Sequence, residues 1–213
     1  MIRPIKLMIF DYPSTFIAKY SPWGYIRYSS YKDWLRDEFG FRCVYCLTRE
    51  MWCPTGHRVF AVEHIRPKVN NKKRINVYEN LTYSCHLCNS LKGTKVTLNP
   101  RIDPLGDHLK VNLDGTINGI TSQGKKMVLL LGLDDPERNA LRKKYIDIYN
   151  AFQDPVLNTH HLIINLYHGV FGYPVLTPNL KAKNPPGLKN KKSVNRCCYQ
   201  RHHGKLPRPV YLM

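Results

Sequence analysis

The segment SCHLCNSLKG, residues 84–93, contains two cysteines separated by two residues, followed at once by an asparagine and then by a lysine and a glycine. This spacing places both thiols on the same side of a helical turn, where they can bind one metal ion. A second pair with the same spacing, Cys43 and Cys46, lies in FRCVYC. Together with Cys85 and Cys88 it forms a CxxC…CxxC pattern, which is typical of a tetrahedral zinc site with four thiolate ligands.

A zinc ion held by four thiolates has no open coordination position for water, so we expect it to stabilise the fold. Any reaction must then take place beside it. Glu63 and His64 are adjacent near the end of a predicted strand, RVFAVEHI. Side chains that are adjacent on a regular strand point in opposite directions, so a bend is needed for both to serve one site. We expect CHLCNSLK to form a helix that Gly93 ends and that brings Asn89 toward Glu63.

The charge of the chain indicates a polyanionic partner. Its 213 residues carry a formal net charge of +18, with a pI near 9.7, and the basic residues are spread along the sequence. Such a balance is typical of nucleic-acid-binding proteins, although on charge alone a ribosomal-type or merely soluble basic protein is the alternative. Charge by itself names no reaction.

The cysteine content indicates the compartment. Seven cysteines are an odd number, and the two CxxC pairs favour metal-binding thiolates in a reducing, cytoplasmic environment over a disulfide framework. No apolar run approaches the roughly 20 residues that a membrane-spanning helix needs. We therefore expect an intracellular protein without a membrane partner.

The chain divides into three predicted parts. Residues 1–40 form an aromatic and basic extension, residues 41–153 the core domain with appended helices, and residues 154–213 a basic C-terminal extension. Ser30 resembles the N-cap of a short helix that leads into the first cysteine pair. Within the last part, the apolar stretch HLIINLYHGVFGYPVL is expected to be buried helix or strand. No acidic residue follows Asp154, and we expect the basic tail, with its prolines and glycines, to be extended, mobile or ordered only on a polyanion.

A further helix is predicted near the end of the core domain. Asp135 is a candidate N-cap and Pro136 occupies the first helical position, where proline is favoured. Leu141, Tyr145 and Ile148 share one face of this helix, which we expect to be its apolar face.

Several motifs resemble one known family. VEHIRPK, ENLTYSCHLCNSLKG and LNPRIDPLGDH, followed by DGTINGIT and ALRKKY, are similar to HNH endonucleases of the ββα-metal class that carry zinc-binding CxxC pairs. The resemblance spans roughly residues 40–145. It implies an α+β fold: a small zinc-stapled ββα-metal (HNH) core with an N-terminal helix and a C-terminal helical extension.

The resemblance also assigns roles to four residues. It implies that His64 is the general base and that Asn80 orients this histidine through the backbone or its ring nitrogen. Asn89 stands where the family usually has a histidine, an HNN variant, and Glu63 stands where many members have aspartate. Carboxylate and amide oxygens favour Mg²⁺ or Mn²⁺ as the catalytic ion, bound by Glu63 and Asn89.

The implied activity is hydrolysis of DNA phosphodiester bonds, which leaves 5′-phosphate and 3′-hydroxyl ends. Arg66 and Lys92 are expected to contact phosphates, with solvated surface charges as the alternative. Two other functions stay open. The chain could be a non-catalytic, zinc-stabilised nucleic-acid-binding protein, or the nuclease subunit of a defence or mobile-element complex that a partner protein or RNA targets.

Overall fold

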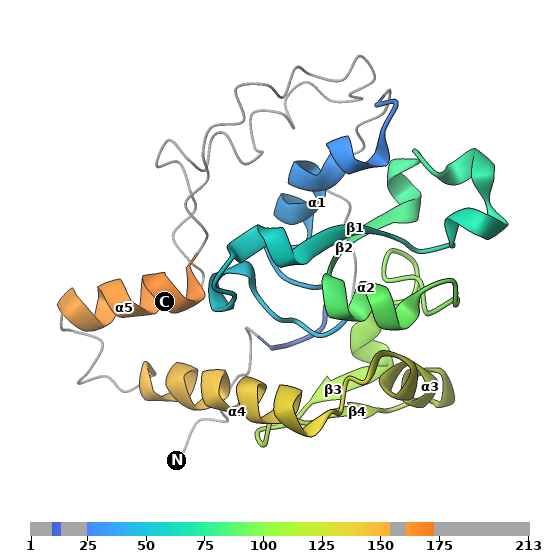
Figure 1. The fold of residues 1–213 in the computed structure, drawn as a ribbon. Coiled ribbons are helices and arrows are strands. Elements are labelled where there is room, and N and C mark those ends of the chain that lie inside the picture. Colours follow the sequence, from blue (N-terminus) through green and yellow to red (C-terminus); the bar gives the residue numbers. More distant parts are fainter. Residues whose placement is uncertain (1–9, 14–24, 154–160, 173–213) are drawn as a thin grey trace.

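The centre of the molecule is an antiparallel hairpin followed by a short helix (Figure 1). The computed structural model describes residues 10–13, 25–153 and 161–172. In the hairpin, Phe60 pairs with Cys85 and His64 pairs with Leu81. This ββα unit consists of β1 (Phe60–His64), β2 (Leu81–Cys85) and α2 (His86–Lys92).

The other described elements surround this unit. In Figure 1, α1 lies on one side of the hairpin, α2 lies on the other, and the second sheet with α3 and α4 forms a layer beneath α2. The two sheets have two antiparallel strands each, so the fold is α+β, as predicted. These elements are α1 (Lys32–Glu38), β3 (Leu109–Val111), β4 (Ile117–Gly119), α3 (Ser122–Leu131), α4 (Pro136–Ala151) and α5 (His161–Phe171).

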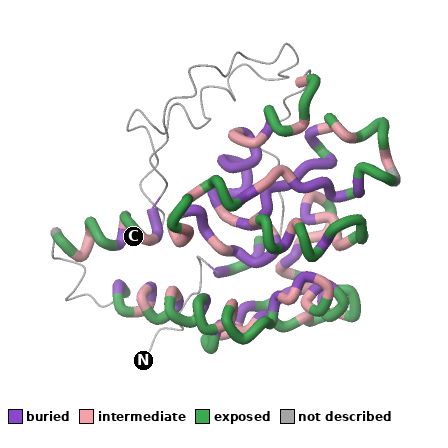
Figure 2. Tube along the Cα trace, viewed as in Figure 1, coloured by how far each residue is buried: buried purple, intermediate pink, exposed green. Residues whose placement is uncertain are grey.

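Aromatic side chains make up much of the core under the hairpin. The rings of Phe60 and Tyr83, from the two strands, stack with their centroids 5.1 Å apart. Tyr31 and Tyr45 are also almost fully buried. Figure 2 shows that buried positions follow α1 and the hairpin, whereas α2 and α4 are exposed along much of their length. A core this close to β1 fixes the backbone from which the site residues project.

The helix that contains the second cysteine pair forms as predicted. Cys85 is the N-cap of α2, and its Sγ accepts a hydrogen bond from the backbone N–H of Cys88. Gly93 ends the helix with φ of +52°, a left-handed conformation that glycine adopts without a steric penalty. The chain can therefore turn sharply at the end of only seven residues.

The predicted cap of α1 is wrong. The helix begins at Lys32 after Tyr31, which makes no side-chain capping bond, and Ser30 lies in a 3-10 turn over Tyr28–Tyr31. Because the backbone of this 3-10 turn is already helical and continues directly into α1, the helix does not begin at a polar cap on Ser30.

The start of α4 is predicted correctly, and its apolar face is predicted in part. The Oδ1 atom of Asp135 accepts hydrogen bonds from the backbone N–H groups of residues 137 and 138. The buried residues are Arg142, Ile146 and Tyr149, whereas Leu141 is 45 % exposed. The buried Arg142 guanidinium donates to the carbonyl of Leu133 and to that of Gly115, which lies in the turn between β3 and β4. Of the predicted face, Tyr145 and Ile148 are half-buried and pack against the core, so the apolar periodicity places two of its three residues correctly.

Part of the predicted C-terminal extension is a packed helix. The Arg49 guanidinium donates to the carbonyls of Phe171 and Gly172 at 2.9 and 3.0 Å, and the Trp52 indole donates to that of Val170 at 3.1 Å. Helix α5 therefore agrees with the expectation that this apolar stretch is a buried helix or strand. Residues 173–213, which hold most of the predicted basic tail, lie outside the described residues. Within the described segments, every helix is too short or too polar to cross a bilayer.

Candidate functional site

Four cysteine thiols converge at the Cys85 end of the hairpin. Cys43 and Cys46 come from a tight turn in which Leu47, with φ of +63°, donates its N–H to the carbonyl of Cys43. All four Sγ atoms lie within 4.8 Å of one another, and those of Cys46 and Cys85 are 3.7 Å apart. A tetrahedral ion with Zn–S bonds of about 2.3 Å requires sulfur–sulfur distances of about 3.8 Å. The cluster of Cys43, Cys46, Cys85 and Cys88 can therefore hold a metal ion, and its donor set suits zinc.

A half-buried arginine, Arg138, reaches this cluster from a distant part of the chain. Nη2 of Arg138, in the first turn of α4, donates to the Sγ of Cys88 at 3.1 Å, while Nη1 donates to the carbonyls of Leu131 and Gly132. Burial lowers the pKa of Arg138, but the thiols of Cys46 and Cys88 outweigh this effect and the pKa is raised. The guanidinium thus places a positive charge against sulfurs that become negative when they bind metal.

A pocket of about 400 Å³ lies beside the other end of the hairpin. It brings together three of the predicted site residues, Glu63, His64 and Asn89. Glu63 and His64 are adjacent at the end of β1, and both line the pocket even though they are neighbours on a strand. The wall is completed by Tyr28, Ser29, Lys32, Phe60, Ala61, Val62, Pro67, Lys68, Val69, Gly93 and Thr94.

The His64 imidazole is held in one tautomer. Its Nε2 lies 3.0 Å from the backbone carbonyl of Ile75, which can only accept a hydrogen bond. Nε2 must therefore carry the proton, so the unprotonated Nδ1 of the neutral ring keeps a free lone pair. Burial lowers the pKa of His64 from its ordinary value of 6.5, with only partial compensation by the bond to Ile75. The ring is therefore neutral at pH 7 and can accept a proton.

Tyr28 and Lys68 complete the surroundings of His64. The Tyr28 ring meets the imidazole edge-on, with centroids 4.8 Å apart and planes at 74°. The Lys68 ammonium lies 4.7 Å from the centroid of the Tyr28 ring and donates to its hydroxyl at 3.2 Å. Neither the contact of Tyr28 with His64 nor that of Lys68 with Tyr28 was predicted from the sequence. The sequence indicates only that Lys68 is close to His64, because it follows four residues later in the same loop.

Asn80 fixes the loop that follows β1. Its Oδ1 accepts from the backbone N–H of Arg66, and its Nδ2 donates to the carbonyls of Arg66 and Arg74. Its own carbonyl accepts from the backbone N–H of Ile65. Asn80 thus holds the backbone on both sides of the loop, next to His64 at one end and next to Ile75 at the other.

Glu63 is paired with a buried lysine. The Lys92 ammonium donates to Oε1 of Glu63 at 2.9 Å and to the carbonyl of His64 at 2.8 Å. The side chains are 0 % exposed for Lys92 and 4 % exposed for Glu63. Burial raises the pKa of Glu63, and the charge of Lys92 acts in the opposite direction.

The prediction that Lys92 contacts phosphate does not fit this position, because its ammonium is enclosed and already bonded. Arg66, the other predicted phosphate contact, is exposed on the loop outside the pocket wall. Asn89 lies on α2 one turn before Lys92, half-buried at the pocket. Lys92 looks like a solvated residue in the sequence because lysine in the last turn of a short helix is usually exposed.

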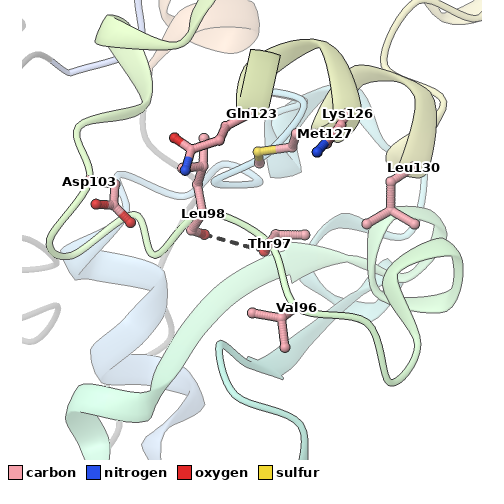
Figure 3. A pocket seen from close by; sticks show the side chains of 8 residues that line it. All are labelled: Val96, Thr97, Leu98, Asp103, Gln123, Lys126, Met127 and Leu130. Atoms are coloured by element: carbon pink, nitrogen blue, oxygen red, sulfur yellow. Dashed lines mark hydrogen bonds between the residues drawn. The ribbon is translucent and has the colours of Figure 1, made fainter. Parts of the chain in front are cut away.

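A second pocket, of about 300 Å³, lies between α3 and the segment that follows α2 (Figure 3). It contains one carboxylate, Asp103, and one ammonium, Lys126, and its other side chains are uncharged. Asp103 accepts a hydrogen bond from the backbone of Asn99 and so helps to fix the segment. With no histidine or thiol in its wall, this pocket offers no counterpart to the chemistry around His64.

Comparison with known proteins gives one distant relative. A segment of 102 residues, 46 % of this chain, is 30 % identical to the Septu protein PtuB of Bacillus thuringiensis. The match covers 38 % of the length of that protein. No protein-family profile matches the chain. The likeness to PtuB and the four-cysteine cluster together fit a zinc-binding, nuclease-like protein.

Proposed function

We propose that this chain is a metal-dependent DNA endonuclease of the HNH type that acts as a subunit of a defence complex. The observation that carries the proposal is the His64 imidazole, whose Nδ1 is free while Nε2 is bonded to a backbone carbonyl. A histidine that is fixed in this way, neutral and lining an open pocket, has the properties of a general base.

His64 is assigned the role of taking a proton from the attacking water. The Ile75 carbonyl holds the ring in the required tautomer before the reaction and stabilises the imidazolium that forms when Nδ1 accepts the proton. Asn80 keeps this carbonyl in place through the neighbouring Arg74 carbonyl. The reaction cleaves the bond to the 3′ oxygen and leaves a 5′-phosphate.

Glu63 and Asn89 are the residues that would hold Mg²⁺ or Mn²⁺. Both line the pocket, and their carboxylate and amide oxygens are the hard donors that these ions prefer. A bound ion supplies Lewis-acid stabilisation of the phosphate charge and of the leaving oxygen. Lys92 bonds only Oε1 of Glu63 and neutralises its charge, so we expect the ion to bind weakly until a phosphate adds negative charge.

The four cysteines are assigned a structural zinc ion. Their sulfur donors and mutual distances suit this ion, and a site with four protein ligands leaves no position for water. The assignment to a defence complex comes from the likeness to the Septu protein PtuB, which covers less than half of either chain. A non-catalytic nucleic-acid-binding protein is the alternative, and it needs no free base in the pocket.

The test is cleavage of supercoiled plasmid by zinc-loaded protein with Mg²⁺ or Mn²⁺. We expect His64→Ala to lose on the order of 10²- to 10⁴-fold in rate, the usual contribution of a general base. The matched control is His57→Ala, which removes an imidazole from an exposed position outside the pocket wall and should cleave as the wild type does. Equal cleavage by the His64 variant would exclude the proposed role of His64. DNA binding without cleavage by the wild type would mean that the isolated chain needs a partner or only binds DNA.

A further inference from the structure

The loop between the two strands of the ββα unit carries an unusual density of positive charge. Residues 64–78 contain no acidic residue and five basic ones. All five side chains are exposed, and they are Arg66, Lys68, Lys72, Lys73 and Arg74. No salt bridge to Lys72, Lys73 or Arg74 forms within the described segments of the chain. These charges are therefore available to an anion from outside.

The loop is anchored to the pocket at both of its ends. On the outgoing side, the Asn80 side chain bonds the backbone of Arg66. On the returning side, the carbonyl of Arg74 accepts from Asn80, and that of Ile75 is bonded to His64. The backbone of Arg74 is thus one residue away from the group that holds the proposed base, while its side chain points into solvent. The backbone that carries the Arg74 side chain is therefore held in place relative to His64, and a phosphate bound by this side chain would lie near the pocket.

Two lysines line the pocket wall itself, Lys68 from this loop and Lys32 from α1. Lys68 is held by the Tyr28 ring and hydroxyl, and Lys32 donates to the carbonyl of His57. The positive charge of Lys68 lies close enough to His64 to contribute to the lowering of its pKa. Positive charges are therefore present both in the pocket wall and on the exposed 72–74 segment of the loop that follows it.

We infer that Lys72, Lys73 and Arg74 form a phosphate-binding edge that places duplex DNA across the pocket, an assignment that rests on the proposed endonuclease function. The three side chains bind phosphates that flank the one at His64, and the anchored backbone sets their register with it. Contacts of this kind carry no base information, so they position DNA of any sequence. Any preference for a particular DNA sequence must then come from contacts other than these three side chains.

The test is DNA binding at a series of salt concentrations, measured by fluorescence anisotropy with a labelled 20-base-pair duplex. All proteins are full-length, zinc-loaded and carry His64→Ala, so binding is read without cleavage. One variant combines Lys72→Gln, Lys73→Gln and Arg74→Gln. The matched control combines Lys110→Gln, Lys125→Gln and Lys144→Gln. These three exposed lysines lie on β3, α3 and α4, in the layer beneath α2 (Figure 1).

Each phosphate that a protein neutralises contributes about 0.9 to the slope of log affinity against log salt. We expect the loop variant to lower this slope by roughly two to three units and the control to change it by less than about one. An unchanged slope for the loop variant, or equal changes for both variants, would overturn the inference. Tighter binding to polyglutamate than to the duplex would also overturn it, in favour of an acidic protein partner.

The two assignments can fail separately. Suppose that the loop variant shows the expected smaller slope of log affinity against log salt, but the wild-type protein never cleaves plasmid. The DNA-binding edge then stands, and the endonuclease function of the isolated chain falls. If the wild type cleaves and the loop variant binds DNA unchanged, the function stands and this edge is wrong. Equal melting temperatures of both triple variants exclude unfolding as the cause.

Discussion

The ββα unit has a different kind of site at each end of its hairpin. At the Cys85 end, four Sγ atoms lie within 4.8 Å of one another, the arrangement of a four-ligand metal site. At the His64 end, the histidine side chain lines a pocket and its Nε2 is bonded to a backbone carbonyl. The seven-residue α2 joins the two, since Cys88 lies in its first turn and Lys92 in its last. We propose that the cysteine cluster holds the scaffold and that the pocket at His64 carries out the chemistry, and the short helix α2 joins the two.

Each site also has a cation bonded to it, half-buried at the cysteine cluster and fully buried beside Glu63. Arg138 donates to the Sγ of Cys88, and Lys92 donates to the carboxylate of Glu63. The first cation reaches its site from 50 residues away in the sequence, and the second from 29. We therefore expect effects of different size when a cysteine ligand, the cation beside Glu63 or the cation beside Cys88 is removed.

The largest effect is expected at the closed site. Cys85→Ser removes one of four proposed zinc ligands, and the apparent free energy of binding a structural zinc ion, about 10–16 kcal/mol, is comparable to or larger than the stability of a whole domain. We expect this variant to lose both zinc and its cooperative unfolding transition, as measured by metal analysis and circular dichroism.

The matched control is Cys53→Ser. Cys53 is half-buried outside the cluster, and its thiol faces the carbonyl of Arg49. The control should keep a wild-type melting temperature and one equivalent of zinc. A Cys85 variant that melts like the wild type without zinc would mean that the sulfur cluster does not stabilise the fold.

A smaller effect is expected from the cation beside Glu63. Lys92→Met leaves a buried carboxylate without its partner, a change that typically costs about 3–5 kcal/mol of unfolding free energy. The double variant Lys92→Met with Glu63→Gln should recover part of this loss, because the remaining group is neutral. Chemical denaturation of the wild type, both single variants and the double variant measures the coupling.

The pH dependence of Lys92→Met gives a second criterion. Without Lys92, the folded protein raises the pKa of Glu63 further above its unfolded value. Its stability is then highest below the unfolded pKa and falls as the pH rises through the raised one. The loss relative to the wild type should be smaller at acidic pH than at neutral pH. A loss that is independent of pH would indicate that the Lys92 side chain contributes only packing.

Local chemistry was enough to predict several individual features. The cysteine spacing brings the four thiols together, Gly93 ends α2 and Asp135 caps α4, and each of these depends on residues that are close in the sequence. The ββα arrangement itself was expected from the family resemblance. The adjacent Glu63 and His64 were predicted to need a bend, yet both line the pocket from the end of β1. The pocket closes around the strand end, where the loop and α2 both contribute to its wall.

Contacts between distant segments could not be predicted from local patterns. The burial of Arg142 on α4 was not expected, and burial of Lys92 turned a predicted phosphate contact into an internal ion pair. In each case a long cationic side chain found carbonyl or carboxylate partners that only the tertiary structure supplies. Sequence patterns predict that such side chains are exposed, because lysine and arginine are rarely buried in folded proteins.

The smallest effect is expected from the cation beside the cysteines. Arg138→Gln removes the charged donor to Cys88 Sγ, and loss of a group that supports a metal ligand typically lowers metal affinity about 10- to 100-fold. Competition with a chelator measures this change, and Lys144→Gln, an exposed position on the same helix, is the control.

Arg138 also bonds the carbonyls of Leu131 and Gly132, so its loss could act through the junction between α3 and α4. Cobalt-substituted protein separates the two effects, because the sulfur-to-cobalt charge-transfer band responds to a hydrogen bond on the thiolate and not to distant packing. A shifted band with weaker metal binding would mean that Arg138 supports the thiolate. A lower melting temperature with unchanged band and affinity would mean that it only joins the helices, and the parallel between Arg138 and Lys92 would then fail.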